Sequence, residues 1–127
     1  MLKAIIVDAS AVSRGLLNTV LTDGGYDVVG QAHTVAAAQP AALKHQPHFI
    51  CIAREQFEDG IEAVDALRAH LPKTLIFMVS GTLDAAAIQG ALGRGVHGFI
   101  VKPFKADTVL RTIRNTILAI VNKHRAG

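Results

Sequence analysis

"FICIAREQF", residues 49 to 57, contains the apolar run from which the fold of this chain is most readily inferred. Four apolar residues, Phe49 to Ile52, follow one another without a polar residue between them. A strand with one solvated face alternates apolar and polar side chains, whereas a continuous run predicts a strand covered on both faces, as in parallel sheets. The run leads into Ala53, Arg54 and Glu55, at the kind of strand end where α/β proteins hold their functional groups.

Four more apolar runs recur along the chain, with helical spacing between them. They are "AIIV" (4–7), "YDVVGQA" (26–32), "LIFMV" (75–79) and "GFIV" (98–101). The second run alternates more and contains Gly30 and Gln31, which favours an edge strand. Five strand–helix units joined by right-handed crossovers predict an α/β protein with a doubly wound sheet of five parallel strands.

The helical segments have recognisable ends. Ser10 and Thr34 are suitable N-caps for the first two helices, and Gly24-Gly25 ends the first. Pro40 lies inside the second helix, where it removes a hydrogen bond, and predicts that this helix is short, kinked or broken. The other helices are predicted over Glu58–His70, Leu83–Arg94 and Ala106–Lys123. In the first helix the apolar residues predicted to share one face are Val12, Leu16, Leu17, Val20 and Leu21.

Composition limits the functional classes. The 127 residues form one domain, 1–127, and half of them are hydrophobic while 18% are charged, which predicts a well-filled core. The apolar runs are too short to span a bilayer and the N-terminus lacks a signal-peptide pattern, so we expect a soluble cytoplasmic protein. A net charge of +3, one tyrosine and no tryptophan make nucleic-acid binding an unlikely role. The single cysteine, Cys51, lies in an apolar run and is predicted to be a buried hydrophobe.

The loops that follow the strands carry a family pattern. The segments "IIVDAS", "GYDVVGQA", "MVSG" and "GVHGFIVKPF" occur in the order and at the spacing of the receiver domain of bacterial two-component response regulators, which the whole chain resembles. The resemblance is to the chemotaxis-regulator-like branch. It implies a flavodoxin-like (βα)5 fold with strand order 2-1-3-4-5.

The resemblance also implies a phosphorylation pocket. In the family, a histidine kinase transfers a phosphoryl group to an aspartate after the third strand, beside Mg²⁺. Asp8 matches the first metal-binding acid, Ser80 the hydroxyl after strand four, Lys102 the lysine after strand five, and Phe99 the aromatic residue that reports occupancy. Ser80 and Phe99 are therefore switch-like positions. Two structural alternatives remain open: Ser80 is a turn hydroxyl, and Phe99 is part of the core.

Two positions depart from the family pattern together. Ala9 stands where a second metal-binding acid is common, and Ala53 stands at the phosphoacceptor position. A methyl group has no nucleophile, and one remaining carboxylate, Asp8, can pair directly with Lys102. We therefore expect no catalytic residue, an Asp8–Lys102 ion pair in place of the metal, and Mg²⁺ binding that is lost or weak. Glu55, two residues beyond Ala53, is the other acid near this pocket.

The last helix contains more apolar residues than one buried stripe requires. In the receiver family, the face made by helix four, strand five and helix five often mediates dimerisation or partner binding, so the corresponding surface is expected to bind a partner or a second copy. The alternative is that these residues complete the core. The residues assigned to this surface are Val109, Ile113, Ile117, Ile120 and Val121.

These observations predict an atypical receiver, or pseudo-receiver: a non-enzymatic, phosphorylation-independent interaction module of a two-component or phosphorelay system. Its partners would be a histidine kinase, another regulator or an output domain. One alternative is an active receiver with a different acceptor, for which the candidates are Asp8, Glu55, Asp59 and Ser80. Another is a small-ligand sensor that reuses the vacant pocket. The sequence leaves open whether the chain is a stand-alone receiver or a fragment of a larger regulator.

Overall fold

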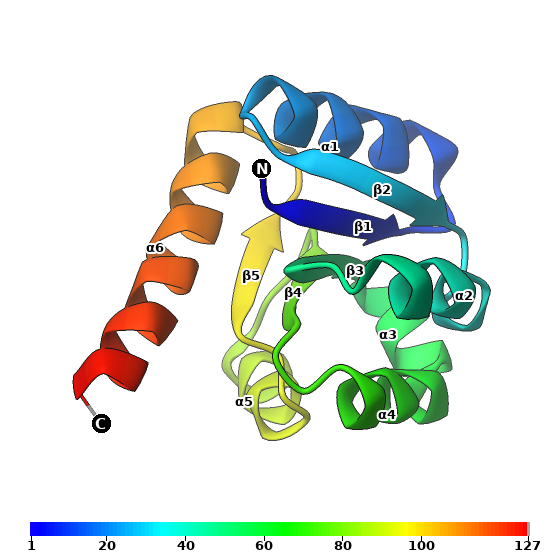
Figure 1. The fold of residues 1–127 in the computed structure, drawn as a ribbon. Coiled ribbons are helices and arrows are strands. Elements are labelled where there is room, and N and C mark those ends of the chain that lie inside the picture. Colours follow the sequence, from blue (N-terminus) through cyan, green and yellow to red (C-terminus); the bar gives the residue numbers. More distant parts are fainter. Residues whose placement is uncertain (127) are drawn as a thin grey trace.

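The computed structural model describes residues 1–126 and has a central parallel sheet (Figure 1). Each pair of neighbouring strands is parallel, and the spatial order is β2-β1-β3-β4-β5. This is the predicted doubly wound architecture and strand order. The strands are β1 (Lys3–Val7), β2 (Asp27–Ala32), β3 (Phe49–Ala53), β4 (Leu75–Ser80) and β5 (Gly98–Val101).

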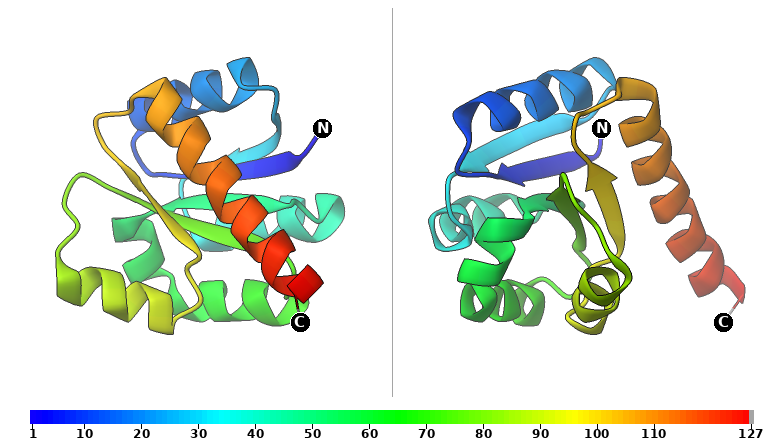
Figure 2. Two further views of the ribbon diagram at one scale, coloured as in Figure 1. Left: turned by 90° about the vertical axis from the view of Figure 1, so that its left-hand side faces the viewer. Right: turned by 180° about the vertical axis from the view of Figure 1, so that it is seen from behind.

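Helices cover both faces of the sheet (Figure 2). On one face, α1 and α6 pack against a cluster centred on Phe49, Cys51 and Phe77, and on the other, α2 to α5 pack against Ile50, Ile52 and Ile76. No helix within residues 1–126 is long and apolar enough to cross a membrane. The helices are α1 (Ala11–Asp23), α2 (Val35–His45), α3 (Arg54–Asp59), α4 (Ile61–His70), α5 (Ala85–Gly93) and α6 (Ala106–Ala126).

The central strand β3 is the most completely buried element. All five of its residues are buried, whereas the edge strand β2 is half-buried or exposed along its length. Phe49 contacts Tyr26 and Phe77 edge-to-face, with ring centroids 5.2 Å and 5.6 Å apart. Aromatic rings favour this geometry because the positive edge of one ring meets the negative face of the other. Cys51 is buried beside them as predicted, and burial raises the pKa of its thiol.

Side chains cap the helices at the predicted positions. The Ser10 hydroxyl accepts from the Ser13 N–H at 3.2 Å, and the Thr34 hydroxyl accepts from the Ala37 N–H at 3.1 Å. Asp84 caps α5 by accepting from the Ala87 N–H at 2.8 Å. The fourth predicted helix therefore begins at Ala85, two residues later than expected, because Asp84 is its N-cap and accepts from one of the first-turn amides that have no acceptor within the helix.

The predicted disruption at Pro40 is wrong in so far as α2 continues through this residue without a break. Pro40 is exposed, and it removes one backbone donor, while Val35, Ala38 and Ala42 on the opposite side are buried in the core. Burial of that face holds the helix together across the missing hydrogen bond.

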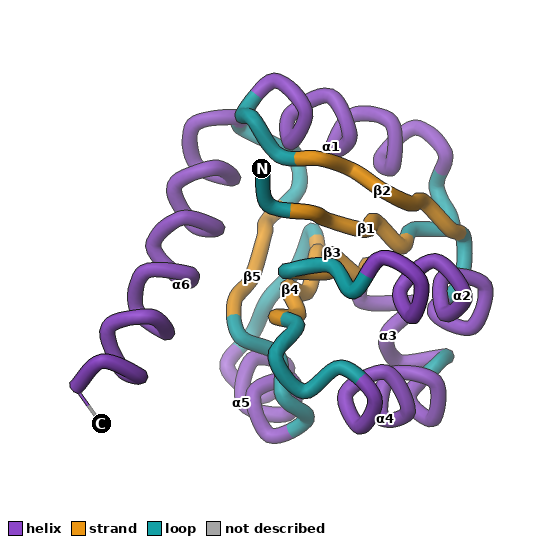
Figure 3. The backbone as a smooth tube through the Cα atoms, in the orientation of Figure 1, coloured by secondary structure: helices purple, strands orange, loops and turns teal. Residues whose placement is uncertain are grey.

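The predicted Glu58–His70 helix ends at His70 as expected, but its start is wrong, because the structure has two helices in this region. α3 begins at Arg54, directly after β3, and α4 begins at Ile61 (Figure 3). Gly60 lies between them, and its N–H donates to the Gln56 carbonyl at 3.0 Å. A Cβ at position 60 would lie 3.0 Å from the same oxygen and 3.4 Å from Val35, so glycine permits this close junction.

The apolar residues of α1 were predicted to share one face, but only some of them face the core. Leu17 and Leu21 are buried, but Val12 is 73% exposed and Leu16 is 57% exposed. At about 100° per residue, Val12 and Leu21 lie on roughly opposite sides of the helix. One sheet face cannot cover such a wide arc, so the first two turns of α1 leave two large apolar side chains in solvent.

The apolar residues of α6 divide in a similar way, which corrects the predicted partner surface. Val109 and Ile113 are buried against the sheet and belong to the core, because they occupy the stripe that faces β5. Ile117 and Ile120 are half-buried, whereas Val121 remains exposed. Leu118, which was not assigned to the surface, is 50% exposed.

His97 provides a pH-dependent link between β4 and β5. The Nδ1 atom of its ring accepts from the Ile76 N–H at 3.1 Å, which requires the neutral imidazole. The backbone N–H of His97 donates to the Ile76 carbonyl at 2.8 Å. Desolvation, with a smaller contribution from the Arg68 guanidinium, lowers the pKa of His97 below 6.5. The unfolded chain therefore binds more protons near this pH. The stability that His97 contributes is present above pH 6.5 and is lost as the pH falls through its folded-state pKa.

We expect His97→Gln to reduce the loss of stability on acidification, because glutamine keeps an acceptor but does not titrate. Urea unfolding at pH values of about 7.5 and 5.5 measures the loss for each protein. His33→Gln, at an exposed histidine between β2 and α2, is the control and should retain the wild-type difference. Equal pH differences for His97→Gln and wild type would contradict this role.

Candidate functional site

The polar side chains predicted to form a pocket lie after the carboxyl ends of the strands. Parallel pairing brings Ala53 beside Val79 and Ser80 beside Val101. The strand order reverses between β1 and β3, which is where ligands bind in doubly wound sheets. Backbone bonds extend this edge: the Lys102 N–H donates to the Ser80 carbonyl at 3.0 Å.

Asp8 and Lys102 form an ion pair across this edge, with Lys102 Nζ 3.0 Å from Asp8 Oδ2. Asp8 is buried, and its other carboxylate oxygen accepts from the Ser10 N–H at 2.8 Å. The Arg14 guanidinium donates to the Asp8 backbone carbonyl at 2.6 Å. The predicted Asp8–Lys102 pair is therefore present, and both carboxylate oxygens of Asp8 have partners within the chain.

The two alanines belong to the same edge of the sheet as this ion pair, Ala53 at the end of β3 and Ala9 next to Asp8 in the chain. Ala53 ends β3 and is 1% exposed, so only a methyl group occupies that strand end. Ala9, in the β1–α1 loop, is exposed, and its N–H donates to the side-chain oxygen of Gln56 at 3.1 Å. Gln56 was not identified from the sequence, because its reach to Ala9 depends on α3 beginning directly after β3.

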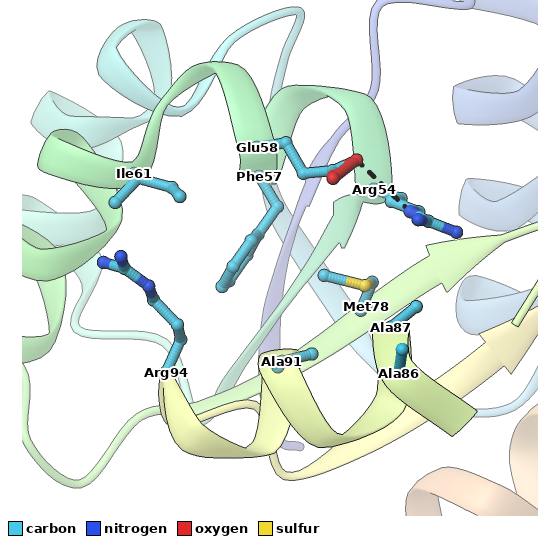
Figure 4. Close-up of a pocket in the computed structure, with 10 residues that line it drawn as sticks. Arg54, Phe57, Glu58, Ile61, Met78, Ala86, Ala87, Ala91 and Arg94 are labelled. Carbon is cyan, nitrogen blue, oxygen red and sulfur yellow. Dashed lines mark hydrogen bonds and ion pairs between the residues drawn. The ribbon is translucent and has the colours of Figure 1, made fainter. Parts of the chain in front are cut away.

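Arg54 connects α3 to the loop between β4 and α5. Its Nη1 donates to the Thr82 carbonyl at 3.1 Å, and its Nε lies 3.2 Å from Glu58 Oε1 (Figure 4). The Arg54 side chain is 27% exposed, so the guanidinium lies partly within the protein. The side chain crosses to the loop that follows the neighbouring strand, β4.

Ser80 and Phe99 have structural contacts. Ser80 is buried, and its hydroxyl donates to the Thr82 carbonyl at 2.8 Å while accepting from the Thr82 N–H at 3.1 Å. Phe99 is half-buried and packs against the core cluster beneath α2 to α5. Glu55 is exposed on α3. The structure thus joins Asp8 to Lys102 and gives Ser80 the contacts of a turn hydroxyl.

The groups at the strand ends are a poor donor set for a divalent cation. Mg²⁺ requires oxygen ligands in near-octahedral geometry, usually several waters with one or two carboxylates and substrate phosphates. Here the buried carboxylate of Asp8 is already bonded to an ammonium and an amide. Within the described residues, no three His, Cys, Asp or Glu side chains come together as a metal-binding group.

Comparison with known proteins identifies the family. The protein-family model of the response regulator receiver domain matches residues 4–114 of the chain. The chain belongs to the response regulator receiver domain family. This receiver domain is 31% identical over 116 residues to the chemotaxis protein CheY of Bacillus subtilis, and the match covers 91% of the chain and 97% of CheY.

Two further comparisons place this receiver domain among its relatives. It is 40% identical over 106 residues to a protein-glutamate methylesterase/protein-glutamine glutaminase of Halobacterium salinarum, in a match that covers 81% of the chain but 30% of the enzyme. The structure of the chemotaxis response regulator CheY4 of Vibrio cholerae superposes with a TM-score of 0.80 at 28% identity, covering 91% of this chain and 98% of CheY4. The predicted flavodoxin-like receiver fold is confirmed.

The Asp8–Lys102 pair should contribute measurable stability. In a double-mutant cycle with Asp8→Asn and Lys102→Met, we expect a coupling energy of about 1–2 kcal/mol, because Lys102→Met leaves a buried carboxylate without its cation. The free energy of unfolding in urea supplies the four values. The control cycle is Arg94→Met with Asp65→Asn, a pair 3.5 Å apart whose side chains are about half exposed, with an expected coupling below about 0.5 kcal/mol. Equal couplings would contradict the structural role of the buried pair.

Proposed function

We propose that this chain is a phosphorylation-independent receiver domain, a non-enzymatic, cytoplasmic module that signals through protein contacts. The observation that carries the proposal is the position of Ala53, whose methyl group ends the central strand at the topological switch point. In the receiver family the phosphoacceptor aspartate follows the third strand. An alanine at that point has no oxygen that can attack phosphorus.

The ion pair supports the same proposal. Transfer of a phosphoryl group needs cations that neutralise the charge on its oxygens. In this chain the Lys102 ammonium neutralises Asp8 at 3.0 Å. With Ala9 in place of a second acid, no further carboxylate competes for the lysine there. We infer that the ion pair replaces the metal and that Mg²⁺ binding is lost or weak.

The contacts of the β4–α5 loop also favour independence from phosphorylation. The Thr82 carbonyl accepts from both Arg54 and the Ser80 hydroxyl, and the same hydroxyl accepts from the Thr82 N–H. In the family, a hydroxyl at the position of Ser80 binds the phosphoryl group. Here these bonds hold the loop in one arrangement without any added ligand, which leaves partner binding as the proposed means of control.

A protein partner is proposed to bind the face formed by α5, β5 and α6. This face has large exposed apolar side chains, and such side chains cost solvation free energy until a partner covers them. A groove of about 440 Å³ lies where β5, an edge strand, meets α6, and Phe99, Lys102 and Thr112 are among its lining residues. A histidine kinase, another regulator, an output domain or a second copy are the proposed occupants. The exposed apolar residues are Leu92, Val101, Leu118 and Val121.

We expect the wild-type chain to remain unlabelled by acetyl phosphate in the presence of Mg²⁺. Ala53→Asp alone should also remain unlabelled, because Ala9 still leaves the metal short of a ligand, whereas Ala9→Asp combined with Ala53→Asp should accept the phosphoryl group. Intact-protein mass spectrometry gives the stoichiometry, and peptide mapping locates the modified residue. Isothermal titration of the wild type should show a Mg²⁺ dissociation constant weaker than about 1 mM.

Each alternative gives a distinct result in the same experiment. Stoichiometric labelling of the wild type on Asp8, Glu55, Asp59 or Ser80 would identify an active receiver with another acceptor. Labelling of Ala53→Asp as fast as the double variant would show that the acid at position 9 is dispensable. The inactive variant Ala9→Asp, which supplies metal ligation without an acceptor, is the matched control and should bind Mg²⁺ more tightly than wild type without labelling.

The partner surface is tested most cleanly at Leu118. Ile117 is half-buried against the core, so a charge there would also affect folding, whereas Leu118 is half-exposed on the same helix. We expect sedimentation velocity to show concentration-dependent dimers for wild type and monomers for Leu118→Glu. Leu43→Glu, at a similarly exposed residue of α2, is the control and should dimerise like wild type. Unchanged dimers in Leu118→Glu would exclude this part of α6 from the interface.

A further inference from the structure

A second concave site lies between α3 and α5, and Arg54 is the residue that it shares with the strand-end groups described above. It has a cavity volume of about 280 Å³, close to the lower end of small-molecule sites, which span roughly 300–1,000 Å³. Phe57 from α3 and Met78 from β4 extend into it, and Ala91 of α5 lies opposite (Figure 4). Asp8, Ser80 and Lys102 are not among its lining residues.

The cavity exists because α5 carries small residues where it faces α3. Ala86, Ala87 and Gly90 line this side, and Ala91 is the residue of α5 that is buried. A Cβ built at Gly90 has no neighbouring atom within 4 Å. No side chain of α5 therefore fills the space above Phe57 and Met78. Phe57 and Met78 are each 3% exposed and form the floor of the cavity, so an apolar ligand group placed there would cover mainly the exposed Ala86 and Gly90.

Two arginines lie at opposite ends of this cavity (Figure 4). The charged lining residues are Arg54, Arg94 and Glu58, two arginines and one glutamate, and their formal charge is therefore +1. A guanidinium has five N–H donors, and the contacts of Arg54 with Glu58 and Thr82 use only two of its nitrogens.

Arg94 is the more available of the two arginines. Among the described residues, its ion-pair partner is Asp65, at 3.5 Å, and the two side chains are 48% and 51% exposed. Exposed pairs of this kind contribute about 0–1 kcal/mol, so an incoming acid can replace Asp65 at little cost. Arginine also binds carboxylates and phosphates through two parallel hydrogen bonds, which favours an anionic ligand group at this end.

We propose that the α3–α5 cavity binds a small amphipathic organic anion. Its apolar body lies on Phe57 and Met78 against the small residues of α5, and its carboxylate, sulfonate or phosphate group pairs with Arg94 or Arg54. This site goes beyond the proposed partner-binding function and does not depend on it.

The test uses 1-anilinonaphthalene-8-sulfonate, a fluorescent aromatic sulfonate, as the probe. Wild type should bind it saturably with one site per chain. Gly90→Leu should weaken binding at least tenfold, because the leucine side chain occupies the cavity. The variant should be at least as stable as wild type, because glycine disfavours the helical conformation. The matched control is Gly93→Leu, the same change three residues further along α5, where a Cβ also meets no atom within 4 Å but which does not line the cavity. Its affinity should equal that of wild type.

The role of charge is tested separately. Arg94→Gln should weaken sulfonate binding severalfold but leave binding of the neutral analogue N-phenyl-1-naphthylamine unchanged. Arg111→Gln, at an exposed arginine of α6, is the matched control and should change neither. Amide chemical shifts should change at Phe57, Gly90 and Arg94 when the probe is added to the wild-type chain.

Three results would overturn the proposal. They are probe binding that does not saturate, equal affinity of wild type and Gly90→Leu, and chemical-shift changes centred on Val101 of β5 and Thr108 of α6. Equal loss of sulfonate and neutral probe in Arg94→Gln would overturn the requirement for an anion and indicate an apolar site, such as one for a hydrophobic peptide side chain. Thermal unfolding of each variant separates loss of binding from loss of fold.

Discussion

Burial of β3 on both faces constrains the whole molecule. Its five residues lie between β1 and β4 and beneath helices on each side, so every backbone polar group of the strand must be bonded within the sheet. This aligns the carboxyl ends of the neighbouring strands at one edge. Asp8 and Lys102 then meet there although 94 positions separate them along the chain. At that edge β3 itself ends in the methyl group of Ala53.

The polar groups around that methyl group are satisfied by one another. Lys102 pairs with Asp8, Gln56 accepts from the Ala9 N–H, and Arg54 and Ser80 both bond Thr82. Asp8 and Ser80 are the buried polar residues of this set, and a buried polar group without a partner costs about 1–3 kcal/mol, so their bonds stabilise this edge of the sheet. The arrangement supports the proposal that partner contacts, and not a phosphoryl group, control this receiver.

Sequence reasoning succeeded where the signal was local or periodic. Continuous apolar runs predicted the strands, and Ser10 and Thr34 were recognised as caps because their hydroxyls act within one helical turn. It failed where distant segments compete for the same space. The start of α3 at Arg54, and the burial of Val109 with exposure of Leu118, depend on which face of each helix the sheet covers. When a helix has more apolar residues than the sheet can cover, their spacing alone does not predict which of them the sheet will bury.

The sequence by itself determined the order of the five strands, the receiver family, and the absence of an acid at positions 9 and 53, because these follow from residue identity and spacing. Only the tertiary structure decided how the remaining groups were used. Arg54 crosses to Thr82, Gln56 reaches Ala9, and Gly90 leaves a cavity opposite Phe57. The physical reason is that a side chain's partner is set by where its backbone is held. Here that position is fixed by packing between elements far apart in the chain.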